Sequence, residues 1–288
     1  MTAPITRSAI AALCQDTTAS SIIIEIVERT GSTNQDLLAR VARASAPNVP
    51  TFLLALTQTA GRGRAGRVWH SDGCGLTFSL AWPIRRPVSA ISGLSLAVGV
   101  AIAEVLAAQN IDVALKWPND VLLKCNKLAG VLIETVEKPG LLQDGVWAVI
   151  GIGINMAGPP SSLTKTAADH GAVKRSAALP SMDRNVLVAA LLASLAETLR
   201  IFEQRGFAAF AQRWNALHAH AGQVVDIFDG VQVRQHGCAL GVDAAGHLLL
   251  QTENGQVAIV AGDVSLRAAS SPQHSASHPP EENHAAAD

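Results

Sequence analysis

An α+β fold is predicted for this chain of 288 residues, with a mixed or antiparallel sheet and apolar helices packed on one face of it. Short runs of β-branched or alternating residues follow one another with tight turns, rather than with a helix after every strand. Residues 91–110 and 185–204 are apolar at helical spacing. A composition of 49% hydrophobic and 16% charged residues is typical of a globular protein with a large core.

The strands are predicted from apolar runs that end at turn residues. Residues 21–27 are β-branched, and residues 76–82 alternate until Pro83, which is expected to end that strand. Pro118, Asn119 and Asp120 form a turn between two short apolar runs. The expected strands are residues 21–27, 51–58, 76–82, the two runs within 113–123, 128–134 and 147–156.

The helices are predicted from their spacing and start signals. Ser32 or Thr33 can cap a helix that continues through residues 36–43. Leucine recurs every fourth residue from Leu187 to Leu199. Residues 87–103 carry no charge, but serines and glycines interrupt them, so they predict a buried helix rather than a membrane span. The expected helices are residues 8–13, 36–43, 91–110, 185–204 and 206–220.

The remainder of the chain predicts a small second domain and two irregular segments. Residues 157–184 are rich in Pro, Ser, Gly and Ala and are expected to be mobile near a site. Short strands separated by Gly-containing turns indicate a small β-barrel. The predicted division is an N-terminal extension at 1–20, a main domain at 21–220, the barrel at 221–267 and a disordered tail at 268–288.

Composition excludes several classes of protein. A net charge of −1 argues against a protein whose main role is to wrap nucleic acid. The four cysteines form no CxxC pair, which disfavours zinc knuckles and fits a reducing cytoplasm. His218 and His220 are the only close histidine pair, and without a third ligand we expect them at the surface. The N-terminus lacks the pattern of a signal peptide.

Residues 57–69, Thr-Gln-Thr-Ala-Gly-Arg-Gly-Arg-Ala-Gly-Arg-Val-Trp, follow a predicted strand. Their glycines let the backbone approach a ligand closely, and Arg62, Arg64 and Arg67 each offer a planar, permanently charged fork. This pattern predicts a loop that binds an anion. A solvated basic turn and a nucleic-acid contact are the alternatives for this stretch alone.

Further polar groups suit the same chemistry. Lys116 and Lys127 flank the Pro-Asn-Asp turn, and the chain has no clear nucleophile-and-base arrangement. A substrate carboxylate that attacks the α-phosphate of a nucleotide supplies its own nucleophile and needs cations around it. Ser-Thr-Asn at residues 32–34 offers polar groups for a small ligand.

In order along the chain, these motifs resemble those of bacterial biotin–protein ligases. The resemblance covers residues 21–156 and is specific in GRGRxGRxW, KWPND and KLAG; the C-terminal barrel is also similar to the SH3-like end domain of that family. The motifs are Gly31-Ser-Thr-Asn-Gln35, the loop at residues 61–69, Lys116-Trp-Pro-Asn-Asp120, Lys127-Leu-Ala-Gly130 and Gly151-Ile-Gly-Ile-Asn155.

The resemblance implies a class II synthetase-like catalytic domain that converts biotin and ATP to biotinyl-5′-AMP and pyrophosphate. The biotinyl group then passes to a lysine of a biotin carboxyl carrier protein. Lys127 and Arg64 would be catalytic, and Asp120 is a candidate Mg²⁺ contact. The resemblance places biotin against Ser32, Thr33, Asn34, Gln58, Arg62, Gly63, Arg64 and Lys127, and ATP against Arg67, Lys116, Asn119 and Asp120.

The chain also departs from the family pattern. About 20 residues precede the first strand, too few for the winged helix-turn-helix of many bacterial members, so we expect no binding to operator DNA. Residues 157–184 lack the large side chains expected around an adenine. The family often forms homodimers, and Trp69 and Trp117 fit core positions as well as site positions.

Two other functions were weighed against this one. A lipoyl- or octanoyl-protein ligase shares the fold, but the GRGRxGRxW, KWPND and KLAG motifs favour biotin. A nucleic-acid-binding module is opposed by the net charge and by the absence of aromatic residues between the loop arginines.

Overall fold

A seven-stranded mixed sheet forms the centre of the computed structural model, which describes residues 4–43, 49–71, 75–137, 145–157, 177–229, 231–260 and 264–268. Neighbouring strands are antiparallel except β1 and β2, which are parallel and are joined through α2 (Thr33–Val41). In sheet order the strands are β1 (Ile23–Thr30), β2 (Thr51–Gln58), β3 (Leu76–Ile84), β7 (Val146–Ile154), β6 (Asn126–Glu137), β5 (Asp120–Leu123) and β4 (Ala114–Lys116).

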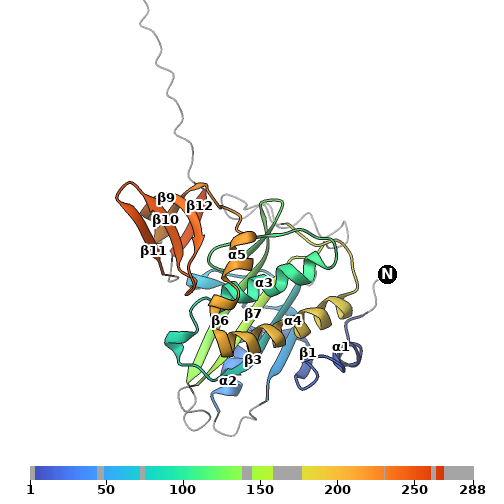
Figure 1. Cartoon of the computed structure of the whole chain (residues 1–288). Coiled ribbons are helices and arrows are strands. Elements are labelled where there is room, and N and C mark those ends of the chain that lie inside the picture. Colours follow the sequence, from blue (N-terminus) through green and yellow to red (C-terminus); the bar gives the residue numbers. More distant parts are fainter. Residues whose placement is uncertain are drawn as a thin grey trace, which may run out of the picture.

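Three helices cover one face of this sheet, as the sequence predicts (Figure 1). They are α1 (Arg7–Cys14), α3 (Leu94–Ala107) and α4 (Arg184–Arg205). Nearly every residue of α3 is buried, because α4 packs on one side of it and strands on the other. Among the described residues, α4 is the one helix long and apolar enough to span a membrane, but most of it is buried in the core.

Helix α2 packs on the opposite face of the sheet, which the expectation of helices on one face did not include. Its Leu37 and Val41 form a separate cluster with Leu53 and Trp147. Successive residues of a strand point to opposite faces, so Phe52 and Leu54 of β2 join the larger core while Leu53 faces α2. The start of α2 thereby reaches the face that holds the candidate site.

Strand β3 continues through Pro83 to Ile84, so the prediction that Pro83 ends the strand is wrong. Strand β2 pairs with β3 only as far as Ala81, whereas β7 pairs with β3 along its whole length. Beyond Ala81 one side of β3 is therefore an edge, where a residue without an N–H costs no ladder hydrogen bond.

The C-terminal part is a second, antiparallel sheet of five strands (Figure 1). In sheet order these are β11 (Gly255–Ile259), β10 (Leu248–Thr252), β9 (Gln232–Val242), β8 (Val224–Asp229) and β12 (Val264–Ala268). It contacts the main sheet through Trp117, whose buried indole Nε1 donates to the carbonyl of Gly246 at 3.2 Å.

Several shorter segments complete the described chain. The helix expected at residues 206–220 is instead the 3-10 turn η4 (Phe207–Ala209) followed by α5 (Ala211–Ala216). Two further 3-10 turns are η1 (Arg64–Gly66) and η2 (Val88–Ala90). The mobile segment and the disordered tail predicted at 157–184 and 268–288 lie mostly outside the described residues.

Candidate functional site

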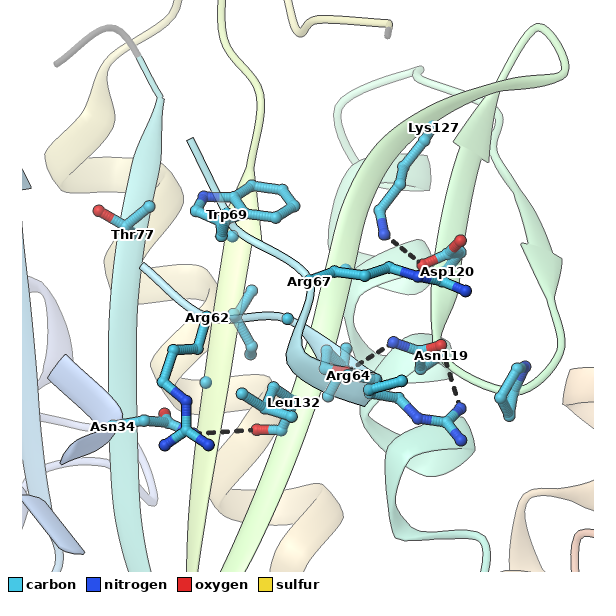
Figure 2. Close-up of a pocket in the computed structure, with 18 of the residues that line it drawn as sticks. Asn34, Arg62, Arg64, Arg67, Trp69, Thr77, Asn119, Asp120, Lys127 and Leu132 are labelled. Atoms are coloured by element: carbon cyan, nitrogen blue, oxygen red, sulfur yellow. Dashed lines mark hydrogen bonds and ion pairs between the residues drawn. The ribbon is translucent and has the colours of Figure 1, made fainter. Parts of the chain in front are cut away.

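One cavity of about 390 Å³ collects every site residue that the sequence predicts. It lies where the start of α2, the end of β2, the loop after β2, the β4–β5 turn and the strands β6 and β7 meet (Figure 2). The predicted residues that line it are Ser32, Thr33, Asn34, Gln58, Arg62, Gly63, Arg64, Arg67, Lys116, Asn119, Asp120 and Lys127.

Strand register builds the polar end of the cavity floor. Ser79 of β3, Gly151 of β7 and Leu132 of β6 lie side by side in one row across the sheet. The Asn34 side chain lies over Gly151, where a Cβ atom would overlap the Asn34 amide. Ser79 Oγ donates to Asn34 Oδ1 at 2.6 Å, and Asn34 Nδ2 approaches the carbonyl of Leu132 at 3.4 Å. Glycine at 151 is therefore required by the position of Asn34.

The next row of the same strands supports a tryptophan. Thr77 of β3, Gly153 of β7 and Gly130 of β6 are in register. The Trp69 indole occupies the space above Gly153 that a side chain there would fill (Figure 2). Trp69 is thus a wall of the cavity rather than a core residue, whereas Trp117 is fully buried.

The loop that carries the arginines is folded back on itself. Gly63 N donates to the carbonyl of Arg67 at 2.7 Å, and Trp69 N donates to the carbonyl of Gly61 at 2.9 Å. A Cβ atom at Gly61 would overlap the Trp69 carbonyl oxygen, so this close approach requires glycine. The result is a closed turn with its arginine side chains directed along the cavity (Figure 2).

Polar residues of the β4–β5 turn and the start of β5 bind two of the cationic side chains. Arg64 Nη1 donates to Asn119 Oδ1 at 3.3 Å. Lys127 Nζ lies 2.6 Å from Asp120 Oδ1 and 5.8 Å from the centre of the Trp69 ring (Figure 2). Among the described residues, five Lys and Arg side chains line the cavity and Asp120 provides one carboxylate, a balance that favours a ligand with several negative charges. The cationic residues are Arg62, Arg64, Arg67, Lys116 and Lys127.

Hydrogen bonds fix the uncharged end. Gln58 Oε1 accepts from the backbone N–H of Thr33 at 2.8 Å, and Thr33 Oγ1 lies 2.7 Å from Ser79 Oγ. Ser32 occupies the N-cap position of α2, as predicted, but its side chain makes no capping bond. Thr33, Asn34 and Ser79 are nearly inaccessible to solvent. Such an end suits a small, uncharged polar group.

His218 is buried and His220 is partly buried at the cavity, so the expectation that the histidine pair lies at the surface is wrong. His218 is 8% exposed and packs against Trp214 with ring centres 4.7 Å apart. Burial, and to a lesser extent the neighbouring His220, lowers the pKa of His218 to about 4. Burial and the nearby Lys116 also lower the pKa of His220, which lines the cavity. No group of three metal-ligating side chains occurs in the described part of the chain.

Sequence reasoning missed Ser79, Thr77 and Glu134 at or next to the site, and it named Gly130 only as part of a motif, without its contacts. Ser79 and Thr77 looked like ordinary polar positions of an alternating strand, and Glu134 like the end of another. Glu134 bonds to Asn34 at 2.9 Å and to Arg62 at 3.3 Å. Gly130 faces Trp69 and Lys127 across the floor. Only pairing between strands distant in sequence reveals them.

Comparison with protein families gives two matches along the chain. Residues 26–155 match the biotin/lipoate A/B protein ligase family, and residues 222–267 match the biotin protein ligase C-terminal domain. The bifunctional ligase/repressor BirA of Escherichia coli is 37% identical over 240 residues, which are 83% of this chain and 72% of that protein. The biotin–[acetyl-CoA-carboxylase] ligase of Mycobacterium tuberculosis is 34% identical over 251 residues, covering 84% and 88% of the two chains.

Solved structures of biotin protein ligases are also similar to this chain. The biotin protein ligase of Aquifex aeolicus in complex with biotin and ATP superposes with a TM-score of 0.67 at 28% identity. The match covers 86% of this chain and 99% of that chain. A Leishmania major ligase in complex with biotinyl-5-AMP has a TM-score of 0.54 at 23% identity, which supports the fold.

Proposed function

This chain belongs to the biotin protein ligase family, and from that premise we propose that the twelve predicted residues in the cavity wall bind biotin and ATP and activate biotin. The protein is an ATP-dependent biotin–protein ligase. One observation carries the assignment of the site: a single cavity joins an uncharged polar end to an end rich in cations. Biotin has a urea at one end and a carboxylate at the other, and the nucleotide adds the phosphates.

In the first half-reaction, a carboxylate oxygen of biotin attacks the α-phosphorus of ATP. The new O–P bond replaces the bond to the β-phosphate oxygen, and pyrophosphate leaves. The carboxylate and the phosphates repel one another, so the chain must neutralise both. We assign this role to Lys127 and Arg64, which both line the cavity, with Arg67 and Lys116 on the phosphates.

The position of Lys127 supports that role. Its Nζ is held between the Asp120 carboxylate and the Trp69 ring, at the boundary between the polar end and the cationic end. A cation held by fixed partners needs little reorganisation when charge develops next to it. Lys127 is therefore assigned to the oxygens shared by biotin and the α-phosphate.

Mg²⁺ accompanies ATP in this proposal. Asp120 is the one carboxylate that the described residues contribute to the cavity wall, and Mg²⁺ in such sites is typically held by one or two carboxylates and by substrate phosphates. The donor set therefore fits a metal that arrives with the nucleotide. Asp120 would hold it, and the ion would supply further neutralisation of the phosphates.

In the second half-reaction, a lysine amine of a carrier domain attacks the carbonyl carbon of biotinyl-5′-AMP, and AMP leaves as the proton passes to solvent. We assign this acceptor to the carrier domain of acetyl-CoA carboxylase, as the name of the Mycobacterium relative suggests. We further propose that residues 21–220 form the catalytic domain and residues 221–267 an accessory domain. A cytoplasmic location is supported by the free thiols of Cys14, Cys125 and Cys238.

Pyrophosphate exchange into ATP tests the site. We expect exchange that depends on biotin and not on lipoate, and a fall of about 100- to 1,000-fold in Lys127→Gln, the typical effect of losing one charge-stabilising donor. Lys124→Gln is the matched control, because Lys124 is exposed on the adjacent hairpin. Exchange at the wild-type rate in Lys127→Gln would contradict its assignment, and exchange with lipoate would favour the lipoyl-ligase alternative.

A further inference from the structure

We infer that Glu134, which does not line the cavity, is a positioning residue. It orients the hydrogen bonds of Asn34, Ser79 and Thr33 so that the cavity presents an acceptor to the urea of biotin. This inference rests on the proposed site. Glu134 lies on β6, two residues beyond Leu132 and on the same face of the sheet. Its Oε1 lies 3.3 Å from Arg62 Nη1, and its Oε2 accepts from Asn34 Nδ2 at 2.9 Å. It therefore joins the arginine loop to the start of α2.

The orientation of the Asn34 amide follows from its partners. Both groups near Nδ2, the Glu134 carboxylate and the Leu132 carbonyl, accept hydrogen bonds and do not donate them. The amide nitrogen must therefore face them, which directs Oδ1 toward Ser79. The Ser79 hydroxyl, which is fully buried, donates its one hydrogen to Oδ1 at 2.6 Å.

The donors and acceptors around Thr33 determine the direction of its O–H bond in the same way. With its hydrogen used, Ser79 Oγ can only accept from Thr33 Oγ1, 2.7 Å away. The other group near Thr33 Oγ1 is Gln58 Oε1 at 3.1 Å, which is also an acceptor because it receives the Thr33 backbone N–H. The Thr33 hydrogen thus points into the protein in either case. Toward the cavity, Thr33 presents an oxygen lone pair.

This polarity selects the chemical class of the ligand group. An acceptor in a nearly buried position favours a ligand N–H and disfavours a ligand that leaves it unpaired. A urea carries two N–H donors and one carbonyl acceptor. The Gln58 amide complements the carbonyl, because its Oε1 is held by Thr33 and its Nε2 lies toward Gly61. A dithiolane ring or an alkyl chain has no such donor.

Only a carboxylate can hold both ends of this arrangement at residue 134. Arg62 and Asn34 reach different oxygens of Glu134, so a glutamine, which has an oxygen at one of these two places and an NH₂ group at the other, keeps an acceptor toward only one of them. If its amide nitrogen faces Asn34, the Asn34 amide turns over and the direction of every following hydrogen bond can reverse. Thr33 Oγ1 then receives the Ser79 hydrogen, and only the longer contact to Gln58 Oε1, at 3.1 Å, still holds the Thr33 hydrogen away from the N–H of the ligand.

Steady-state pyrophosphate exchange with Glu134→Gln tests the inference. We expect the KM for biotin, and for dethiobiotin, which keeps the urea, to rise about 10- to 100-fold, the effect of losing a hydrogen bond to a charged group. We expect kcat at saturating biotin and the KM for ATP to change less than about threefold. Glu137→Gln, on an exposed position of the same strand, is the matched control and should leave every constant unchanged.

A second variant separates this role from a loss of folding. Ser79→Ala removes the next link of the chain, and we expect the same selective rise in the KM for biotin. Both residues act through Asn34. The rise in the KM for biotin in the double variant should therefore be smaller than the product of the rises in the two single variants. A KM for biotin unchanged in both variants, or equal losses in the KM for biotin and for ATP, would overturn the inference. An absence of exchange with biotin in the wild-type protein would contradict the assigned reaction itself.

Discussion

Burial of His218 makes the stability of the protein depend on pH in a way that one substitution should remove. The pKa of His218 is lowered to about 4 in the folded chain, against about 6.5 in an unfolded chain. Between these values the unfolded state binds more protons than the folded state, so the free energy of unfolding falls as the pH falls from 6.5 to 4. At neutral pH the ring is uncharged in both states and the effect vanishes.

The size of the effect follows from the two pKa values. At pH 5 the unfolded ring is almost fully protonated, whereas the folded ring is roughly nine-tenths neutral. Between pH 7.5 and pH 5, His218 therefore lowers the free energy of unfolding by about 2 kcal/mol. His218→Phe keeps the ring contact with Trp214 and cannot take up a proton. When the pH falls from 7.5 to 5, we expect the free energy of unfolding of the variant to decrease by about 2 kcal/mol less than that of the wild-type protein.

Urea unfolding followed by circular dichroism at pH 7.5 and pH 5 measures the difference. His70→Phe is the matched control, because His70 is exposed in the structure. A wild-type protein and a His218→Phe variant with the same change in unfolding free energy would refute the reasoning. Such a result would mean that His218 is solvated in solution.

Three further predictions concern the cavity and its support. Gly153→Ala should displace Trp69 and raise the KM for biotin at least about tenfold, because the new Cβ occupies the space of the indole; quenching of Trp69 fluorescence by acrylamide should increase, and an unchanged KM would contradict the packing. Trp117→Phe should lower the unfolding free energy by about 1–3 kcal/mol in urea titrations, because the buried Gly246 carbonyl loses its donor; no loss would show that water replaces it. Arg64→Ala should slow pyrophosphate exchange about 100-fold or more, and a rate near that of the wild-type protein would remove Arg64 from the charge-stabilising group.

The chemistry of this site could be predicted because its residues are concentrated in short motifs. The glycine–arginine loop alone favours an anion site and leaves a solvated basic turn or a nucleic-acid contact as alternatives, whereas the Pro-Asn-Asp turn and Lys127 support the anion site only together with it. These motifs come together in one cavity because the strands that carry them belong to one sheet. The strands themselves were predicted well because β-branched alternation and Gly or Pro turns are local signals.

Errors arose where a neighbour distant in the chain decides the outcome. Pro83 stays in its strand because β2 ends beside Ala81, which is a property of sheet order. His218 is buried because the strand around Leu115 and the side chain of Trp214 pack against it. Neither contact has a signature in the local sequence.

The sequence by itself determined which reaction to expect, because its short motifs resemble those of one family and supply the cations and glycines that bind an anion. Only the tertiary structure decided how these groups are held. The rows Ser79–Gly151–Leu132 and Thr77–Gly153–Gly130 exist through strand register, which sets the positions of Asn34 and Trp69. Glu134 gains its role in the same way, because a carboxylate can orient an amide only when folding brings the two within hydrogen-bonding distance.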